Sequence, residues 1–407
     1  MFNRTGVLRP ALVALALLAG CSQPGAPKRA GSDGGAAAAQ EAFVFGVILV
    51  GPKNDHGWSE AHYVAGQYLE KKLPGAKMLC VDGMGAKTGV TVPQVVDDMV
   101  AKGARLIFTT SDHFQDGTLE AAKKHTGVRF VNISGDHAWK EGRNYKAPPN
   151  YSNLMGRMEY GKLMMGFAAG LTTRTGSVAY LGPLINDETR RLVNCAYLGA
   201  RHAWVDLRKQ DPKAFRFKVV WIGFWFHKPG ETLDPTQVAD DFYNSGFDVV
   251  LSGIDTTEAL TQAKKARAAG KTVWAMPYDY REAGQGAEEV CLGVPYFNWG
   301  PSYVRIARGI VDGTWKPFFD WVGPDWKDLN DPDTGAIGFA KGPALSAENA
   351  KRLDDFAARL ADGSLNLLKG PLNFQDGSVW LKEGEAATDL QLWYVPQLLE
   401  GMEGKSW

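Results

Sequence analysis

The sequence predicts an α/β protein in which two doubly wound, Rossmann-like lobes face each other across a ligand cleft. Two observations lead to this prediction. From Phe43 onward, short β-branched and apolar runs alternate with segments of helical spacing, which is typical of βαβ units and parallel sheets. The alternation occurs as two similar series, before and after residues 151–157, and the 407 residues of the chain are enough for two domains.

The first series predicts four strands with three helices between them. The strand candidates are rich in β-branched and apolar residues, which suit buried positions in a sheet. The strands are expected at Phe43–Val50, Ala76–Val81, Arg105–Thr110 and Val128–Ile133, and the helices at His62–Lys72, Val92–Lys102 and Gly117–His125.

The second series predicts four more strands and three more helices. The strands are expected at Ser177–Leu181, Phe217–Ile222, Val249–Ser252 and Thr272–Met276, and the helices at Glu188–Lys209, Gln237–Ser245 and Glu258–Ala269. We place the links between the lobes, and the hinge, near Tyr151–Arg157, Pro277–Tyr280 and Asp320–Asp333.

The rest of the chain predicts an addition to the lobes rather than an independent domain. A strand is expected at Glu289–Val294, helices at Pro301–Val311 and Ala347–Leu360, and a brief strand at Val379–Leu381. The predicted organisation is lobe 1 over residues 43–154, lobe 2 over 155–278, a return to lobe 1 over 279–325, and a C-terminal segment over 326–407 that packs on both lobes.

Charge and composition exclude two classes of protein. Lys and Arg total 45, Asp and Glu also total 45, and no long basic block is present, so the charge pattern of a nucleic-acid binder is missing. Hydrophobic residues make up 45% and charged residues 22% of the chain, which is typical of a globular rather than a disordered protein.

The N-terminus has the layout of a bacterial lipoprotein signal. Arg4 and Arg9 accompany the apolar run Ala11–Ala19, which is too short to span a bilayer. Leu18-Ala19-Gly20-Cys21 resembles a lipobox, in which the cysteine receives a diacylglycerol and becomes the mature N-terminus. We therefore expect a signal peptide over residues 1–21 with a lipidated Cys21. An ordinary cleaved signal with an incidental cysteine is the alternative.

The segment after the signal predicts a tether. Residues 22–42 are mostly Gly, Ala, Ser, Pro and Gln without periodicity, a composition typical of flexible linkers. Acyl chains bury CH₂ groups at about 0.8 kcal/mol each, so a lipid on Cys21 would hold the protein on a membrane. The expected location is therefore extracytoplasmic, at the periplasmic face or the cell surface.

Three further cysteines, Cys80, Cys195 and Cys291, lack the spacing of metal sites. We predict that they behave as small hydrophobic residues, with one disulfide at most. Neither a metal nor a cofactor is expected.

Carboxylates and aromatic residues recur directly after the predicted strands. In doubly wound sheets, ligands bind beyond the carboxyl ends of the strands, so these loops are the candidate site. Helix capping is the alternative role for each acid, and core packing is the alternative for each aromatic residue. The candidate ligand-binding residues are Asp55, Trp58, Ser111, Asp112, Trp225, Asp255, Thr256, Tyr278, Asp279, Asn298 and Trp299.

This set of side chains favours binding of a planar heterocycle. Aromatic faces supply stacking, and carboxylates and amides supply hydrogen bonds to N–H donors, a combination that suits a purine. Catalytic interpretations use paired carboxylates as in a glycosidase, or His56 or His113 as a general base. The chain contains no G-x-S-x-G, P-loop or H-E-x-x-H motif and no calcium-binding loop pattern, so a binding protein is favoured over an enzyme.

Several of these motifs resemble the basic membrane protein family, the lipid-anchored substrate-binding components of ABC importers for purine nucleosides and bases. They include Gly51–Trp58, Tyr160-Gly161 with Gly166–Gly170, Pro277–Tyr280, Trp299–Tyr303 with Asp312–Trp315, and Gly370-Pro371 with Trp393-Tyr394. The resemblance covers nearly all of residues 43–404.

The resemblance implies a type I periplasmic-binding-protein fold with a purine held between the lobes. It implies that Asp55 holds the polar edge of the base, that Trp58 and Trp225 supply aromatic faces, and that Asp279 occupies the position of a ribose-binding acid. The implied partners are an ABC permease with its separate ATPase and the membrane, and the implied receptor is a monomer.

Two departures from the nucleoside receptors favour a free base such as adenine. Trp58 replaces their usual Phe, and Asn298-Trp299 stands where they supply a Lys to the sugar. Related members also bind other flat ligands such as riboflavin. Two rival functions stay open: a ligand sensor or surface lipoprotein, and a nucleoside or glycosidic hydrolase.

Overall fold

The computed structural model of the protein describes residues 42–87 and 89–407. The predicted signal peptide, Cys21 and all but the last residue of the predicted tether lie outside the described residues. No helix within these described ranges is both long and apolar enough to cross a membrane.

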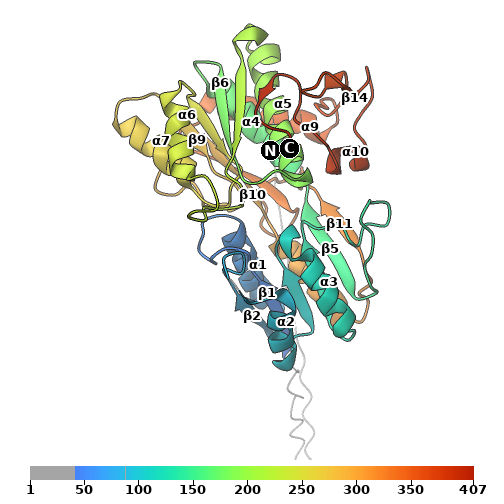
Figure 1. Cartoon of the computed structure of the whole chain (residues 1–407). Helices are drawn as coiled ribbons and strands as arrows, with labels where there is room; N and C mark the ends of the chain where they lie inside the picture. Colours follow the sequence, from blue (N-terminus) through green and yellow to red (C-terminus); the bar gives the residue numbers. More distant parts are fainter. Residues whose placement is uncertain (1–41, 88) are drawn as a thin grey trace, which may run out of the picture. The chain divides into compact units, whose positions relative to one another are not determined.

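The first lobe is built on a parallel sheet with the strand order β2-β1-β3-β4-β5-β11. The strand order reverses between β1 and β3, and doubly wound folds bind their ligands at such a reversal. The strands are β1 (Phe43–Ile48), β2 (Ala76–Val81), β3 (Leu106–Thr109), β4 (Arg129–Ile133), β5 (Tyr151–Gly156) and β11 (Phe319–Val322). The helices beside this sheet are α1 (Trp58–Lys72), α2 (Val92–Ala101), α3 (Gln115–Lys124) and α8 (Gly300–Val311) (Figure 1).

The second lobe repeats this plan on a parallel sheet with the order β15-β7-β6-β8-β9. Its order reverses between β6 and β8. The strands are β6 (Ser177–Gly182), β7 (Arg216–Trp221), β8 (Val249–Ser252), β9 (Trp274–Met276) and β15 (Met402–Glu403). The helices are α4 (Met158–Thr172), α5 (Asp187–Arg201), α6 (Pro235–Asn244) and α7 (Glu258–Ala268). Parallel sheets alternating with helices confirm the predicted α/β class.

Glycines allow α4 and α5 to pack at very close range. A Cβ atom on Gly166 of α4 would collide with the carbonyl oxygen of Ala196, and one on Gly199 of α5 would collide with that of Leu163. The backbones of the two helices therefore touch directly, which fixes α5 rigidly on α4. This contact explains the glycine-rich sequence at residues 166–170.

An antiparallel pair and the C-terminal elements complete the structure. Strand β10 (Gly293–Phe297) pairs with β12 (Ile337–Lys341). Helix α9 (Ala347–Ala361) packs on α4, where the ring of Phe356 stacks on that of Phe167 with centroids 4.0 Å apart. Between α9 and β15 the chain forms β13 (Leu372–Asn373), β14 (Val379–Leu381) and α10 (Asp389–Trp393), and α10 contacts α5.

The final residues contact both lobes. The hydroxyl of Tyr394 donates a hydrogen bond to Asp136, which follows β4 in the first lobe (2.6 Å). The carbonyl of Val395 accepts one from Arg190 of α5 in the second lobe (2.9 Å). Adjacent residues of the tail are thus bonded to different lobes.

Residues 151–157, predicted as a link between the lobes, contain a strand that the sequence did not predict. This segment is the buried strand β5, and its polar side chains conceal it in the sequence because they interrupt the apolar run. Ser152 accepts a hydrogen bond from the N–H of Phe318 (3.1 Å), and Asn153 accepts one from the N–H of Ala138 (2.7 Å). Both polar groups are therefore satisfied inside the fold.

Two other expectations differ from the structure, and several elements were not predicted. The strand expected at residues 289–294 lies at Gly293–Phe297, because the preceding residues form turns. The α-helix expected over 188–209 ends at Arg201, and a π-helical segment, His202–Leu207, follows it directly. Helix α4 and strands β11 and β12 were not predicted. Helix α4 is apolar on nearly every side, so it carries no amphipathic pattern.

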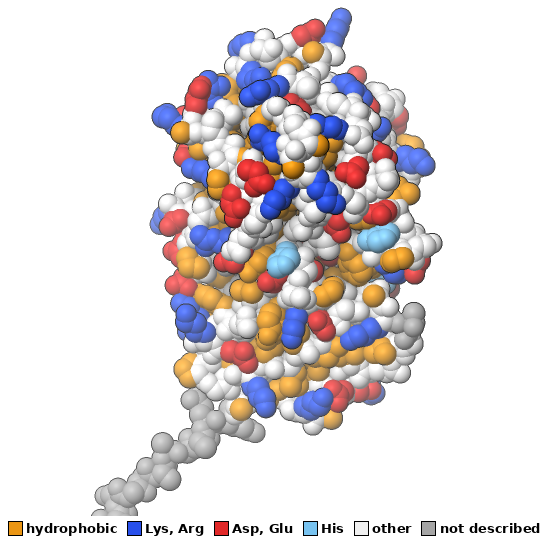
Figure 2. All heavy atoms as spheres, turned by 90° about the vertical axis from the view of Figure 1, so that its left-hand side faces the viewer, with side chains coloured by type: hydrophobic (Ala, Val, Ile, Leu, Met, Phe, Trp, Pro, Cys, Tyr) orange, Lys and Arg blue, Asp and Glu red, His pale blue; other side chains and the backbone are white. Residues whose placement is uncertain are grey.

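The surface and the cysteines agree with their predicted roles. Lys or Arg and Asp or Glu side chains are interspersed over the face in Figure 2, as their equal numbers suggest. Cys80, Cys195 and Cys291 are free. Cys195 and Cys291 are buried, and burial raises the pKa of Cys80 and of Cys291 to about 11, so these two thiols are protonated at neutral pH.

Candidate ligand-binding site

A small cavity of about 10 Å³, room for about one water molecule, lies where the strand-end loops of the two lobes meet. Seven of the eleven strands of the two main sheets are followed by one or two lining residues, namely β1, β3, β4, β6, β7, β8 and β9. This is the location that the switch-point rule predicts. The free space is far below the roughly 300–1,000 Å³ of pockets for drug-sized ligands, so the residues that line it, rather than its volume, mark it as the candidate site. The lining residues are Val50, Trp58, Ser111, Asp112, Ser134, Glu188, Trp225, Asp255 and Tyr278.

Six of the predicted residues line this cavity, and two of them are tryptophans from opposite lobes. Trp58 opens α1 and donates its indole N–H to the carbonyl of Thr110 (2.7 Å). Its ring meets that of Trp299 edge-on, with centroids 5.6 Å apart. Trp225 follows β7, and its carbonyl accepts a hydrogen bond from the N–H of Asp255 (2.9 Å). The Trp58 indole is thus held by its own contacts, whereas the hydrogen bond at Trp225 holds its backbone.

Asp55 caps helix α1, which is the alternative that its position in the sequence left open. Its carboxylate accepts hydrogen bonds from the backbone N–H groups of Gly57, Ser59 and Glu60 at 2.9–3.0 Å. Burial raises its pKa to about 6, and these hydrogen bonds oppose the rise. Asp55 does not line the cavity, and its contact with a ligand remains a prediction.

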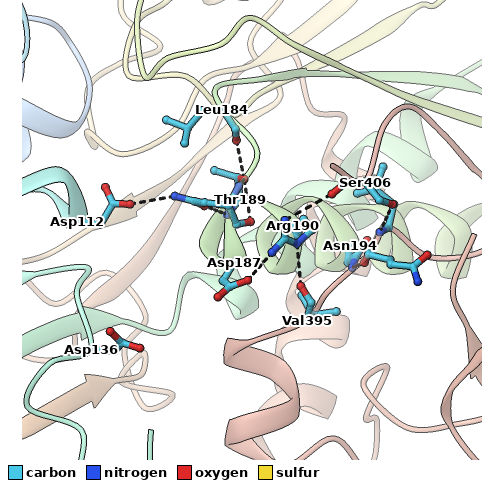
Figure 3. A network of polar contacts seen from close by, with 12 residues as sticks. Asp112, Asp136, Leu184, Asp187, Thr189, Arg190, Asn194, Val395 and Ser406 are labelled. Carbon is cyan, nitrogen blue, oxygen red and sulfur yellow. Dashed lines mark hydrogen bonds and ion pairs between the residues drawn. The ribbon is translucent and has the colours of Figure 1, made fainter. Parts of the chain in front are cut away.

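Asp112 connects the two lobes beside the cavity. It accepts a hydrogen bond from the side-chain amide of Asn186, the residue that caps α5 in the second lobe (3.0 Å). Figure 3 shows this bond, together with Arg190, which joins Asp187 to the carbonyl of Val395. Burial raises the pKa of Asp112. The N-terminal part of α5 is thus bonded to the first lobe through Asn186 and to the C-terminal segment through Arg190.

Glu188 and Ser134 line the cavity, although the sequence interpretation did not select them. The Ser134 hydroxyl, after β4, donates a hydrogen bond across the lobes to Glu188 of α5 (2.7 Å). Burial raises the pKa of Glu188 to about 7. Glu188 was interpreted only as the start of a helix. The strand-end rule, applied to the loop after β6, would have identified it.

Asp255, Tyr278 and Asp279 form the deepest acidic part of the site. Oδ2 of Asp255 is buried and has no hydrogen-bond partner among the described residues. Burial and the neighbouring carboxylates raise the pKa of Asp255 well above its usual range, and burial does the same for Asp279. Asp279 has a positive φ of 77° and is fully buried next to Tyr278, outside the cavity lining.

A buried lysine, Lys162, contacts residues next to this acidic group. No sequence motif indicated it. Lys162 of α4 donates to the carbonyl of Ser252 (2.9 Å), and its Nζ lies 3.2 Å from the centre of the Tyr278 ring. Burial lowers its pKa to about 7, and the nearby Asp279 opposes this shift.

Three predicted residues lie away from the cavity lining. Asn298 donates its amide to the carbonyls of residues 331, 332 and 334. The Trp299 ring is 1% exposed and stacks between those of Phe297 and His62, with centroids 4.5 and 4.7 Å away. Thr256 donates to Glu258 at the start of α7 (2.5 Å). Ligand contact by these three residues remains a prediction.

The sequence of the chain matches a known protein family. A family model for PnrA-like ABC transporter substrate-binding proteins (Bmp) matches residues 42–316. The chain belongs to this family. It is therefore an ABC transporter substrate-binding protein. Proteins of this class lie outside the cytoplasm and work with an ABC permease. The predicted type I periplasmic-binding-protein fold is confirmed.

Individual relatives refine the comparison. A purine-binding protein of Brucella abortus (strain 2308) is 29% identical over 374 residues, which cover 91% of this chain and 96% of that protein. A Haloferax volcanii protein, provisionally named an ABC transporter glucose-binding protein, is 24% identical over 72% of this chain and 67% of its own. A solute-binding protein structure from Aeropyrum pernix K1 shares the fold with a TM-score of 0.63 at 11% identity, over 82% of this chain and 93% of that one.

Proposed function

We propose that the protein is a lipid-anchored, monomeric receptor that captures a purine-like ligand between its lobes and delivers it to an ABC permease with a separate ATPase. A free base such as adenine is the preferred ligand over a nucleoside. The observation that carries the proposal is the lining of the cavity, which combines two indoles with three carboxyl groups, those of Asp112, Glu188 and Asp255. Stacking faces and N–H acceptors are what a purine requires.

The surroundings of the cavity support a base rather than a nucleoside. At the position where the family's nucleoside receptors supply a Lys to the sugar, Asn298 uses its amide on backbone carbonyls and Trp299 packs in the core. The lining residues of the cavity include no cationic side chain, so the contact that a Lys makes with the sugar in those receptors has no counterpart there.

Cross-lobe contacts support capture by closure of the lobes. Ser134 bonds to Glu188 and Asn186 bonds to Asp112 on either side of the cavity. A ligand that touches both lobes would stabilise this arrangement over an open one, because it gains contacts only when the lobes are together.

The first experiment is calorimetry on the detergent-solubilised full chain, after removal of co-purified ligand. Adenine, guanine and hypoxanthine are compared with their nucleosides, riboflavin, glucose and amino acids. We expect bases to bind most tightly and to raise the melting temperature, since a ligand of the native state stabilises it. Binding of glucose or amino acids without purines would overturn the proposal. Anchoring is tested in cells, where Cys21→Ser should release the protein from the membrane fraction.

A further inference from the structure

The cavity lining has more hydrogen-bond acceptors than free donors. Its lining contains three carboxyl groups, two serine hydroxyls and one tyrosine, and no Lys, Arg or His. Ser134 already donates its hydroxyl to Glu188, and the Trp58 N–H is used by Thr110. A ligand in this space therefore meets acceptors that need N–H donors.

Glu188 is a lining acid that makes no salt bridge with any described residue. In the described part of the chain its side chain receives one hydrogen bond, from Ser134 (2.7 Å). The nearest arginine along α5, Arg191, is engaged elsewhere, in a buried ion pair with Glu159 (2.6 Å) and over the ring of Trp393. Lys162 is bonded to Ser252. Glu188 thus retains acceptor capacity toward the cavity.

Asp255 presents a second acceptor without a partner. Its Oδ2 is buried and unpaired among the described residues, and the residue is 3% exposed. A buried oxygen of this kind is costly unless a donor satisfies it. The loops that carry Glu188 and Asp255 follow β6 and β8, the two strands at the reversal of the second sheet, so both acids belong to the same edge of the cavity.

We propose that Glu188 contacts the ligand and, with Asp112 and Asp255, selects purines that carry an exocyclic amino group over otherwise identical bases that lack it. This inference rests on the proposed function. An amino group presents two N–H donors to carboxyl oxygens, which accept hydrogen bonds whether or not the acid is protonated. A base without the group leaves acceptors unsatisfied, and such sites discriminate strongly against the poorer donor.

Two pairs of ligands isolate the amino group. Guanine differs from hypoxanthine only by its 2-amino group, and adenine differs from unsubstituted purine only by its 6-amino group. Calorimetry on the full chain measures the affinity ratio within each pair. We expect the amino-bearing base to bind at least about tenfold more tightly in one or both pairs, as for a buried hydrogen bond to a charged group.

Substitutions at Glu188 then test its role. Glu188→Gln keeps an acceptor without the charge, and Glu188→Leu removes both. The affinity ratio should fall in the order wild type, Gln, Leu. Asp187→Asn is the matched control, because Asp187 is the neighbouring acid of α5, pairs with Arg190 and does not line this cavity. It should leave the ratio unchanged.

The outcomes separate this inference from the proposed function. If no purine binds to the wild type, the proposed function fails. If purines bind but the wild-type ratios are near one, the amino-group selection is wrong while the receptor function stands. This second result does not depend on how any variant folds. If both Glu188 variants fold and keep the wild-type affinity ratios, Glu188 does not contribute to the selection of the amino group.

Discussion

Trp225 carries an aromatic face into the cavity wall and is only 7% exposed. The sequence indicated it because three aromatic residues precede a polar turn at the end of a strand. Phe224 and Phe226, its neighbours, pack edge-on against each other with ring centroids 5.0 Å apart, so the three aromatic residues do not share one role.

At the residue scale we predict that Trp225→Leu weakens ligand binding by about 1–3 kcal/mol, the usual contribution of a base stacked on an aromatic ring. Leu retains apolar volume but offers no flat face. Calorimetry with the best-binding purine measures the change. Trp204→Leu is the control, because Trp204 is equally buried, at 5% exposure, in the same lobe but outside the cavity lining. Equal losses in both variants would contradict a stacking role.

The local sequence could predict candidate residues but not their division of labour. Asp55 and Asp112 both follow first-lobe strands and precede helices. The carboxylate of Asp55 accepts hydrogen bonds from three N–H groups at the start of α1, whereas that of Asp112 accepts one from Asn186 of the other lobe. Capping and ligand contact use the same residue types at the same position. Only the orientation of the two lobes distinguishes them.

At the element scale, the contact between α4 and α5 holds the N-terminus of α5, and therefore Glu188, at the cavity. We predict that Gly166→Ala destabilises the protein by at least about 2 kcal/mol, because the added methyl would overlap the carbonyl of Ala196 and force the helices apart. Urea unfolding measures this loss. Gly127→Ala is the control, since a Cβ at Gly127 has open space around it. Similar stability of the two variants would contradict the close packing.

Elements were predictable where their pattern is periodic or bounded by turns. The strands β1, β3, β4 and β8 are short apolar runs followed by polar loops, and their positions agree with the prediction. Strand β5 contains Ser152 and Asn153, whose partners come from distant residues. Helix α4 is buried nearly all round. Long-range contacts, which no local pattern records, produced both omissions.

At the scale of the whole molecule, the site gathers acids at a cost to stability. Burial raises the pKa of Glu188 from 4.5 to about 7. Between about pH 4.5 and pH 7, the folded state therefore keeps a proton on Glu188 that the unfolded state has released. The free energy of unfolding falls as the pH rises through this range. Buried His62, whose pKa is lowered, acts in the opposite direction, so only a comparison with a variant isolates Glu188.

We predict that Glu188→Gln is stabilised relative to the wild type increasingly as the pH rises from 5 to 7.5, by up to about 2–3 kcal/mol. Gln has the shape of the protonated acid and carries no charge to bury. Chemical denaturation of the ligand-free proteins across this pH range measures the difference. Asp187→Asn, at a half-exposed acid, should show no such trend. A difference that stays constant with pH would contradict the buried, proton-binding state of Glu188.

The tail of the chain sets a mechanical limit on the receptor. Tyr394 is bonded to Asp136 in one lobe, and the next residue, Val395, is bonded to Arg190 in the other. Two consecutive residues thus span the boundary between the lobes. Any motion that carries Asp136 away from Arg190 must break one of these bonds. The C-terminal segment therefore limits how far the two lobes can separate. The maximum opening depends on which of these two hydrogen bonds breaks first.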